Sequence, residues 1–523
     1  MAIDGFNKND MMTKLKDMKG CPKKLLTIVE FMFSSTMSKL VEELDSEFDS
    51  KYGRPAYPRQ MLLGSLMYCF TQKVDDMAGI ERMCRENKFL EVFTCNLRPS
   101  ASTFERLLTN GPRLVFKKIF IATLIELNDL HLLEFIKTFL DSTDAIVNGS
   151  KHYKITLDEI NALKQLKKWD ALHHNTEYSI NKTLNILEEK LEVYTDDDDM
   201  TELINLALGR IELYSVRMYK KRKKLESILL ERDCKYVCIT FPDAVMMKTK
   251  KGEFNYGLNL HQLMTEHNII LTGVLMDQPN DHYAMKWLLE DLKETIEILI
   301  EMQKEFGQRN NYKELQRRID EMILIADSGY CSTENLHTLK EEQINHLLMP
   351  KVISHQCNNE IREKNNIETS KDDSPTSKKN FKRVKNSYIC PSNQKLEYQG
   401  SKDINFRKID TSQIPEYQIK KRYIYECQTC TGCPYIETCK HKRIEERVTP
   451  LQHDMIEKFT NKRYKKMYQD RFHISEGING FIKRTNGMFK LISPNKQAAD
   501  NEMQLRNTIY NLIRTVNLKG TAY

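Results

Sequence analysis

The stretch that decides the fold is Met322-Ile-Leu-Ile-Ala-Asp-Ser-Gly-Tyr330. Its first five residues are apolar and of strand length, and Asp327 follows them directly. A second stretch, Ile136-Lys-Thr-Phe-Leu-Asp141, has the same form, with Asp141 at its end. In open α/β sheets, functional groups gather at the carboxyl ends of the strands. The two stretches therefore predict two strands that bring Asp141 and Asp327 together.

Further strand patterns follow the first aspartate. They cover residues 236–240, 256–263 and 269–276, and a helical pattern covers residues 285–303 before the strand at 322–326. This order of strand, hairpin, helix and strand predicts a mixed α/β sheet. Residues 157–230 are charged and leucine-bearing, broken by an acidic run at 196–199, which predicts two antiparallel helices inserted into that fold.

The N-terminal part, residues 1–130, is predicted to be helical because apolar residues recur three and four positions apart, as in Leu62, Leu66 and Phe70. The run Ser102-Thr-Phe-Glu105 has the spacing of a capping box that opens a helix. Two interpretations stay open for this part. It is either an ordinary helical bundle or a helix-turn-helix unit, in which Ser102 and Arg106 would contact DNA from the helix in the groove.

Composition limits the classes of protein that fit. The 523 residues correspond to about three domains, and 40% are apolar, which is enough for a packed core. The charge of +7, from 80 basic and 73 acidic residues, is compatible with nucleic acid without requiring it. No apolar run reaches the ~20 residues of a membrane span, and residues 1–10 lack a secretory core. We therefore expect a cytoplasmic protein with no membrane partner.

A cysteine cluster is the sharpest metal signal in the chain. Four of the thirteen cysteines share the pattern C-x2-C-x2-C-x5-C, namely Cys427, Cys430, Cys433 and Cys439. In a reducing cytosol such density indicates a metal rather than disulfides, and four thiolates favour a structural Zn²⁺. An iron–sulphur cluster and four free thiols are the alternatives. Cys390 or His441 can replace one of the four ligands.

The rest of the C-terminal half is polar or basic. Residues 353–387 have few large apolar side chains and are predicted to form a mobile linker, and a helical part begins at about residue 451. Basic runs cover residues 379–385, 440–443 and 461–466. Such runs either neutralise DNA phosphates or form a solvated surface.

A third carboxylate completes a possible phosphoryl-transfer site. Glu476 lies at the start of a helical stretch, residues 473–484. Carboxylate oxygens are ligands that Mg²⁺ prefers, and a pair of such ions suits phosphoryl transfer. The alternative is that each acid merely caps a turn or helix. Asp277, Asp281 and His282 form another polar patch, which we interpret as a turn and helix start, with direct catalysis as the alternative.

The sequences of these acidic segments resemble motifs of a known protein family. Three phrases resemble the acidic blocks of the DDE transposases of bacterial insertion sequences: Asp141-Ser-Thr143, Ala326-Asp-Ser-Gly-Tyr330 and Ser475-Glu-Gly-Ile-Asn-Gly-Phe-Ile-Lys-Arg484. Gly53-Arg-Pro-Ala-Tyr-Pro-Arg-Gln-Met-Leu-Leu63 and Phe241-Pro-Asp-Ala-Val-Met-Met-Lys248, followed by Tyr256-Gly-Leu-Asn259, resemble other regions of one such group. The resemblance runs from about residue 50 to residue 515.

The resemblance implies an RNase H-like catalytic fold in which Asp141, Asp327 and Glu476 bind Mg²⁺ or Mn²⁺. Asp144 is a rival of Asp141 in the first block. Cysteine-bearing inserts between the second and third acids occur in similar transposases, which implies a structural role for the cysteine cluster.

The family's last block commonly carries a tyrosine, an arginine and a lysine around the glutamate, and Tyr468, Arg471 and Lys483 match them here. Arg471 lies one residue further from Glu476 than the usual spacing. Lys483 follows Glu476 by two helical turns, so that it and the adjacent Arg484 are expected to contact DNA phosphates.

The implied activity is transposition. The protein would bind the terminal inverted repeats of an insertion sequence, cleave double-stranded DNA with water and join the freed 3′-hydroxyl to target DNA without ATP. It would act in the bacterial cytoplasm at the nucleoid, as a homodimer or larger assembly on DNA. Two alternatives stay open: an inactive or repurposed DNA-binding protein, and a metal-dependent nuclease that cuts without joining.

The predicted organisation is an α/β protein with an RNase H-like core interrupted by insertions. The boundaries are a helical DNA-binding domain at 1–130, core parts at 131–150, 233–352 and 446–523, a helical insertion at 151–232, and a polar linker with a zinc-binding, cysteine-rich insertion at 353–445.

Overall fold

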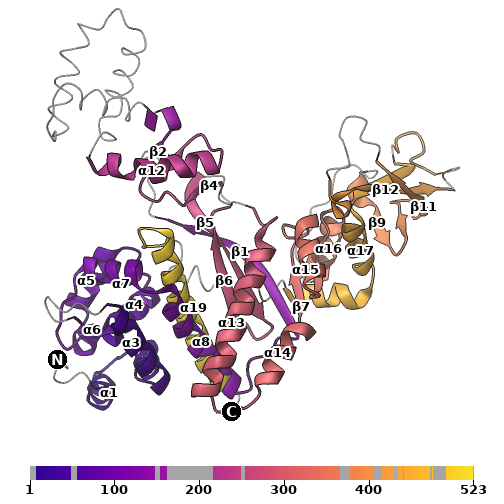
Figure 1. Cartoon of the computed structure of the whole chain (residues 1–523). Coiled ribbons are helices and arrows are strands. Elements are labelled where there is room, and N and C mark those ends of the chain that lie inside the picture. Colours follow the sequence, from indigo (N-terminus) through magenta and orange to yellow (C-terminus); the bar gives the residue numbers. More distant parts are fainter. Residues whose placement is uncertain are drawn as a thin grey trace, which may run out of the picture.

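The computed structural model describes most of the chain, with gaps. The described residues are 7–48, 56–147, 154–158, 160–161, 216–248, 254–278, 280–364, 377–404, 414–428, 430, 433–439, 441–471, 474 and 490–521. Helices at the N-terminal end, a mixed sheet and a second, antiparallel sheet follow one another across the molecule (Figure 1). No helix in these ranges is long and apolar enough to cross a membrane.

The N-terminal helices pack as one helical bundle. They are α1 (Lys8–Asp17), α2 (Lys23–Met32), α3 (Ser35–Glu47), α4 (Arg59–Thr71), α5 (Met77–Glu86), α6 (Lys88–Phe93), α7 (Ala101–Asn110) and α8 (Arg113–Asp129). Twelve of the 13 residues of α4 and twelve of the 17 residues of α8 are buried, which places both helices at the centre of the bundle. The prediction of helices in this part is confirmed.

The capping box predicted at Ser102 is wrong. Helix α7 already begins at Ala101, with Ser100 as its N-cap residue, so Ser102 lies inside the first turn. The backbone N–H of Ala101 donates to the carboxylate of Glu81 in α5, 2.9 Å away. A side chain of the neighbouring helix α5 therefore accepts from the first N–H group of α7, where the local spacing had predicted capping by Ser102.

The central sheet has six strands, three of which carry the site. Its path is β4–β5–β1–β7–β8, and β6 also pairs with β5; the bounds are β1 (Lys137–Ile146), β4 (Val245–Lys248), β5 (Phe254–Thr265), β6 (Ile270–Met276), β7 (Ile323–Ala326) and β8 (Asn345–Leu348). Strands β4, β5, β6 and β1 pair antiparallel, whereas β1, β7 and β8 pair parallel. The predicted mixed α/β sheet is confirmed.

The first strand is longer than its sequence predicts. Asp141 does not end β1, because β5 pairs with β1 from Thr138 to Ile146 and carries it past the apolar run. Asp327, by contrast, does follow the last residue of β7. Leu140 and Ala326 are register partners on two neighbouring parallel strands. Asp141 and Asp327 are the next residues of the two chain segments and therefore lie side by side.

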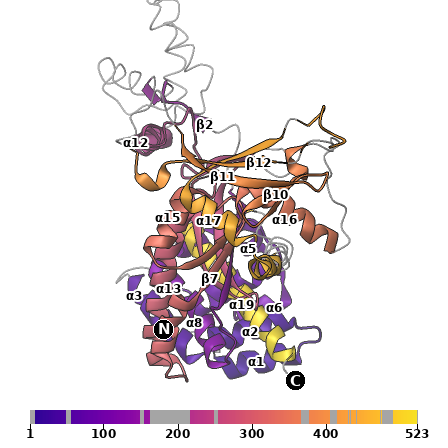
Figure 2. The same cartoon turned by 90° about the vertical axis from the view of Figure 1, so that its right-hand side faces the viewer.

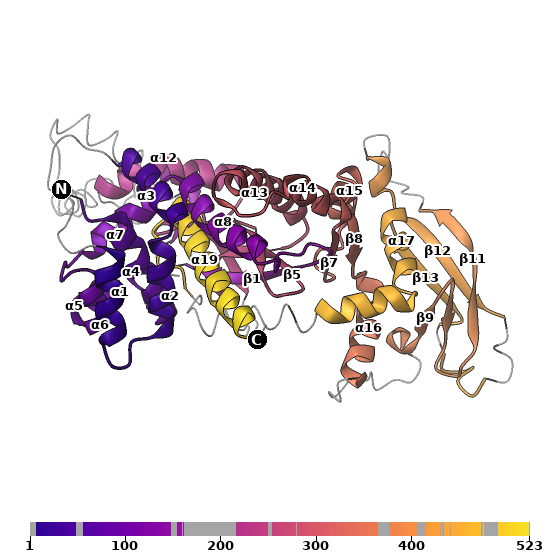
Figure 3. The same cartoon turned by 90° about the horizontal axis from the view of Figure 1, so that it is seen from below.

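Helices cover both faces of the sheet. Thr272 of β6 contacts Asp291 of α13 (Ala284–Phe306), while a Cβ on the next residue, Gly273, would meet Asn507 of α19 (Lys496–Thr521). Because successive strand residues point to opposite faces, α13 and α19 lie on opposite sides of β6. Helix α14 (Tyr312–Glu321) and α15 (Thr333–Glu341) continue the layer of α13 (Figure 3).

Helix α19 joins the sheet to the N-terminal bundle through buried amides. Asn501 donates to the backbone carbonyls of Leu108 and Gly111, both at 2.9 Å. Asn511 accepts from the N–H of Ile270 and donates to its carbonyl, both at 3.0 Å. These amides satisfy buried backbone groups, which makes a polar helix suitable for an interior position.

A second sheet follows the first in the chain. It is antiparallel and has the order β13–β12–β11–β10–β9, with bounds β9 (Lys382–Val384), β10 (Ser387–Ile389), β11 (Lys395–Asp403), β12 (Lys421–Cys427) and β13 (Arg443–Val448). Helices α16 (Lys351–Lys364) and α17 (Pro450–Lys458) lie beside it (Figure 2). Inside, Arg383 pairs with Glu446 at 3.1 Å, and both side chains are almost fully buried.

The mobile linker predicted at residues 353–387 is wrong over its described part. Helix α16 spans its first third, with Ile353 and Cys357 buried one turn apart, and β9 lies near its end; residues 365–376 are outside the described residues. This segment is mostly hydrophilic, but Ile353 and Cys357 anchor its helix and the buried ion pair of Arg383 with Glu446 anchors its strand.

The helical insertion predicted at 151–232 lies mostly outside the described residues. Of it the structure describes β2 (Lys154–Ile155), which pairs with β3 (Val237–Cys238), and α12 (Val216–Glu231). Short 3-10 helices cover Lys378–Asn380 and Glu416–Gln418, and residues 462–471 are helical.

Candidate acidic site

Two of the three predicted acids converge on one cation. The guanidinium of Arg471 lies 2.9 Å from Oδ1 of Asp141 and 3.3 Å from Oδ2 of Asp327. The side chains of Arg471 and Asp141 are 12% and 17% exposed, and that of Asp327 is 37% exposed. Asp141 of β1 and Asp327, which follows β7, thus share one positive charge at the carboxyl end of β7.

The electrostatic balance at this point is negative. Burial raises the pKa of Asp141, and the nearby Asp327 and Asp281 raise it further, while Arg471 opposes the rise. Burial also raises the pKa of Asp281. Three mutually repelling carboxylates near one guanidinium form a place where additional positive charge is stabilised.

Asp144, the rival of Asp141, lies elsewhere. It is three residues further along β1, so its side chain leaves the opposite face of the strand, and its register partner is Asn259. The contact with Arg471 is made by Asp141.

The loop after β7 holds Asp327 in a fixed orientation. The N–H of Gly329 donates to Oδ1 of Asp327 at 2.9 Å, which leaves Oδ2 toward Arg471. Behind the loop, the buried Tyr330 hydroxyl lies 2.6 Å from Nδ1 of His261. Burial lowers the pKa of His261 to about 4, so this imidazole is neutral at neutral pH.

Sequence reasoning missed the polar residues of β5. Asn259 donates from Nδ2 to Oδ1 of Asp281 at 3.0 Å, and His261 lies two residues further on the same face. A period-two pattern of polar residues inside an otherwise apolar strand was the available signal. Asp277 pairs instead with Arg232 at 2.5 Å, and His282 is exposed.

The other residues predicted from the last acidic block are either buried or outside the described residues. Tyr468 is 6% exposed and packs edge-on against Phe459, with ring centroids 5.3 Å apart. Burial raises the pKa of Tyr468 to about 12. Its ring is therefore part of the core beneath Arg471. Glu476, Lys483 and Arg484 lie outside the described residues.

Ser102 and Arg106 lie on the exposed side of α7, in the bundle at the far side of the molecule from β7 (Figure 1). Nε of Arg106 donates to the carbonyl of Ser102 at 3.1 Å, one turn earlier in the same helix. The Arg106 residue as a whole is exposed.

The cysteines of the second sheet gather around a small pocket. Its lining includes Cys390, Cys427, Cys430, Cys433, Cys439 and His441, with apolar walls from Phe381, Leu396 and Ile436. A hydrogen bond with Cys427 raises the pKa of Cys430 to about 11, and Sγ of Cys433 lies 3.3 Å from the Ser392 hydroxyl. Within the described residues, no three His, Cys, Asp or Glu side chains are placed to hold one metal ion. The predicted zinc site is therefore not supported.

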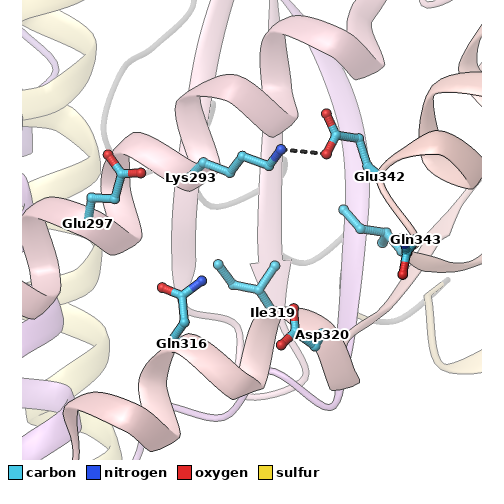
Figure 4. Close-up of a pocket in the computed structure, with 8 residues that line it drawn as sticks. Lys293, Glu297, Gln316, Ile319, Asp320, Glu342 and Gln343 are labelled. Carbon is cyan, nitrogen blue, oxygen red and sulfur yellow. Dashed lines mark hydrogen bonds and ion pairs between the residues drawn. The ribbon is translucent and has the colours of Figure 1, made fainter.

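A larger pocket of about 500 Å³ opens between α13, α14 and the segment 342–344 that follows α15 (Figure 4). Its walls carry Glu297, Gln316 and Asp320, and an ion pair at 2.5 Å joins Lys293 to Glu342. The lining of this pocket consists mainly of paired charges and amides, and it contains no buried nucleophile or base. The acidic site at Asp141 is the better candidate for chemistry.

Two models of known protein families match parts of the chain. A transposase domain model (DUF772) matches residues 22–110, in the N-terminal bundle, and a transposase DDE domain model matches residues 389–516, from the second sheet through α19. No curated protein and no solved structure matches the chain. In the sequence, one match precedes and the other follows the strands of the sheet that carries Asp141 and Asp327. The two matches support a DDE transposase of an insertion sequence.

Proposed function

We propose that this transposase binds the ends of its insertion sequence and catalyses metal-dependent cleavage and strand transfer of DNA, with Asp141, Asp327 and Glu476 as the acidic triad. The observation that carries the proposal is the shared ion pair of Arg471 with Asp141 and Asp327, at 2.9 and 3.3 Å. Two carboxylates from neighbouring strands that converge on one positive charge support a cation-binding site suited to phosphoryl transfer.

The topology supports an RNase H-like core. The path β6–β5–β1–β7–β8 has three antiparallel strands followed by two parallel ones, with the aspartates on the central strand and its parallel neighbour. We retain the proposed core parts at residues 131–150, 233–352 and 446–523, with residues 1–130 as a separate DNA-binding domain.

The donor set fits a hard divalent cation. Carboxylate oxygens suit Mg²⁺ or Mn²⁺, and Asp141 and Asp327 would hold such ions together with Glu476. A bound pair of these ions would activate the attacking oxygen and stabilise the leaving oxygen.

The chain's own residues supply the rest of the site. Gly329 orients the Asp327 carboxylate, and the buried Tyr468 supports the helix that carries Arg471. Arg471 would move from the carboxylates to a DNA phosphate when cations bind, because a guanidinium binds a phosphate well and is repelled by a metal ion. Lys483 and Arg484 would contact further phosphates.

DNA recognition is assigned to two places. Arg106 and Ser102 on α7 would contact the terminal repeats, since α7 presents an exposed face that carries a basic side chain. Bringing two element ends together requires two copies of the site, so we propose that at least a dimer assembles on DNA.

The experiment is a cleavage and joining assay with DNA that carries the gene's own flanking sequences and Mg²⁺. Wild-type protein is compared with Asp141→Asn, Asp327→Asn and Glu476→Gln, with Asp320→Asn on α14 as the control. We expect cut and joined products from the wild type and the control, and none from the three site variants.

The alternatives give different outcomes. Binding without cutting in Mg²⁺ or Mn²⁺ would favour an inactive or repurposed DNA-binding protein. Cutting without joined products would favour a nuclease. Full activity in either aspartate variant would remove that residue from the triad.

A further inference from the structure

Two loops are locked together behind the acidic site. One connects β6 to α13 and contains Asp281; the other follows β7 and contains Asp327. The side chain of Asn335, 1% exposed, donates to the backbone carbonyls of Asp281 and Tyr330, both at 3.0 Å. The hydroxyl of Ser332 donates to the carbonyl of His282 at 2.7 Å. The backbone of the Asp327 loop therefore depends on the position of the Asp281 loop.

The Asp281 side chain reaches into the site from this junction. Its Oδ1 accepts from Asn259 at 3.0 Å, and Ser142, the neighbour of Asp141, also hydrogen-bonds its carboxylate. His261 lies 3.8 Å from the same oxygen, but it is not a counter-charge at neutral pH because burial keeps it neutral. The carboxylate is thus fixed by neutral donors from β5 and β1.

Gly329 packs directly on this carboxylate. A Cβ at Gly329 would lie 2.6 Å from Oδ2 of Asp281 and 3.2 Å from Oδ1 of Asp327, and the former is below any allowed contact distance. A side chain at this position is opposed by the Asp281 carboxylate and not by backbone conformation, since the φ of Gly329 lies outside the left-handed region. The N–H of the same glycine holds Oδ1 of Asp327.

We propose that Asp281 is a positioning residue of the acidic site: held by Asn259 and Ser142, it sets the path of Gly329 and thereby the orientation of Asp327. This inference rests on the proposed function of Asp141 and Asp327. Asp281 acts through hydrogen bonds and packing, and neither its charge nor a bound ion is part of the role.

The test is a double-mutant cycle between Asp281 and Gly329 in the full-length protein. Asp281→Ala frees the loop, and Gly329→Ala forces a Cβ against the carboxylate; we expect each to lower the kcat of DNA cleavage about tenfold or more, with the Kd for end DNA unchanged. In the double variant the contact no longer exists, so the loss should match that of Asp281→Ala alone and not the product of the two.

A conservative variant separates positioning from charge. Asp281→Asn keeps an oxygen that accepts from Asn259, so it should restore most of the kcat that Asp281→Ala loses. Asp277→Ala is the matched control: it removes a carboxylate from the same connection, one that pairs with Arg232, and should leave kcat within twofold of the wild type.

Three outcomes would overturn the proposal. Multiplicative losses in the double variant would show that Asp281 and Gly329 are not coupled. An Asp281→Asn variant as inactive as Asp281→Ala would show that the charge itself acts. A raised Kd for end DNA in Asp281→Ala would assign the residue to binding.

If the wild type cleaves no DNA, the proposed function fails, but the coupling is still measurable. Thermal unfolding of the four proteins should then show non-additive changes in Tm, and additive changes would reject the packing argument independently of any activity.

Discussion

Replacing Arg471 with alanine removes the guanidinium that Asp141 and Asp327 share. In the absence of a metal ion, the two neighbouring carboxylates then repel each other without a shared positive charge between them. Removing one partner of a buried ion pair costs about 3–5 kcal/mol, whereas exposed pairs contribute about 0–1 kcal/mol. Arg471 is 12% exposed and Asp327 is 37% exposed, so part of this loss is screened by water. We expect Arg471→Ala to lose about 2–4 kcal/mol of unfolding free energy in EDTA.

Divalent cations should reverse much of that loss. A ligand present at about 100 times its Kd stabilises the folded state by about 2.7 kcal/mol. In the wild type, Mg²⁺ must displace Arg471, while in Arg471→Ala no guanidinium competes with the cation for the two carboxylates. Mg²⁺ should therefore bind the variant more tightly and raise its stability by more than that of the wild type.

The assay is urea unfolding with EDTA and with increasing Mg²⁺, in the absence of DNA. Arg318→Ala, which breaks a pair with Glu314 on α14, serves as the control and should lose stability without any change in its response to Mg²⁺. An equal Mg²⁺ response in Arg471→Ala and the wild type would refute the reasoning, because Arg471 would then not compete with the cation. Unchanged stability in EDTA would show that the ion pairs contribute nothing.

Three other predictions concern the rest of the molecule. Burial raises the pKa of Asp500 on α19 to about 6, so its stabilising effect is complete below about pH 4 and is lost as the pH rises through 6. Asp500→Asn should raise the free energy of unfolding in urea at pH 8 by about 1–3 kcal/mol and leave it unchanged at pH 4; a gain at both pH values would contradict this. Asn511→Ala leaves the buried N–H and C=O of Ile270 without the amide that binds both, and should cost about 2–4 kcal/mol in urea unfolding; a smaller loss would mean that water replaces the amide. Arg106→Ala should weaken binding to end DNA and reduce the slope of log K against log salt by about 1, and an unchanged slope would exclude a phosphate contact.

The sequence predicted local elements well where the pattern that defines them is local. The apolar run before Asp327 forms a strand of nearly the predicted length, and the pattern at 285–303 forms α13 with only small extensions. In both cases the buried face follows from the spacing of apolar residues within one element. The predicted boundaries fail where a partner extends or caps the element, as β5 does for β1 and Glu81 does for α7.

The polar segments were less predictable. Residues 353–387 contain too few apolar side chains to suggest order, yet part of them forms α16 and β9 around the buried pair of Arg383 and Glu446. The two charges lie 63 positions apart in the chain, so no local pattern relates them. A satisfied polar core cannot be recognised from composition, because its stability depends on which donors meet which acceptors.

By itself, the sequence determined that Asp327 follows an apolar strand, that Asp141 follows an apolar run, and in which order the transposase motifs occur. Only the tertiary structure decided how those acids are held. Arg471 reaches Asp141 across 330 positions, and Asn335 reaches Asp281 across 54. Periodicity reports which face of an element is buried, because that is a property of neighbouring residues. The orientation of a carboxylate is set by hydrogen bonds from strands and loops that meet only after folding, and no spacing within one segment encodes them.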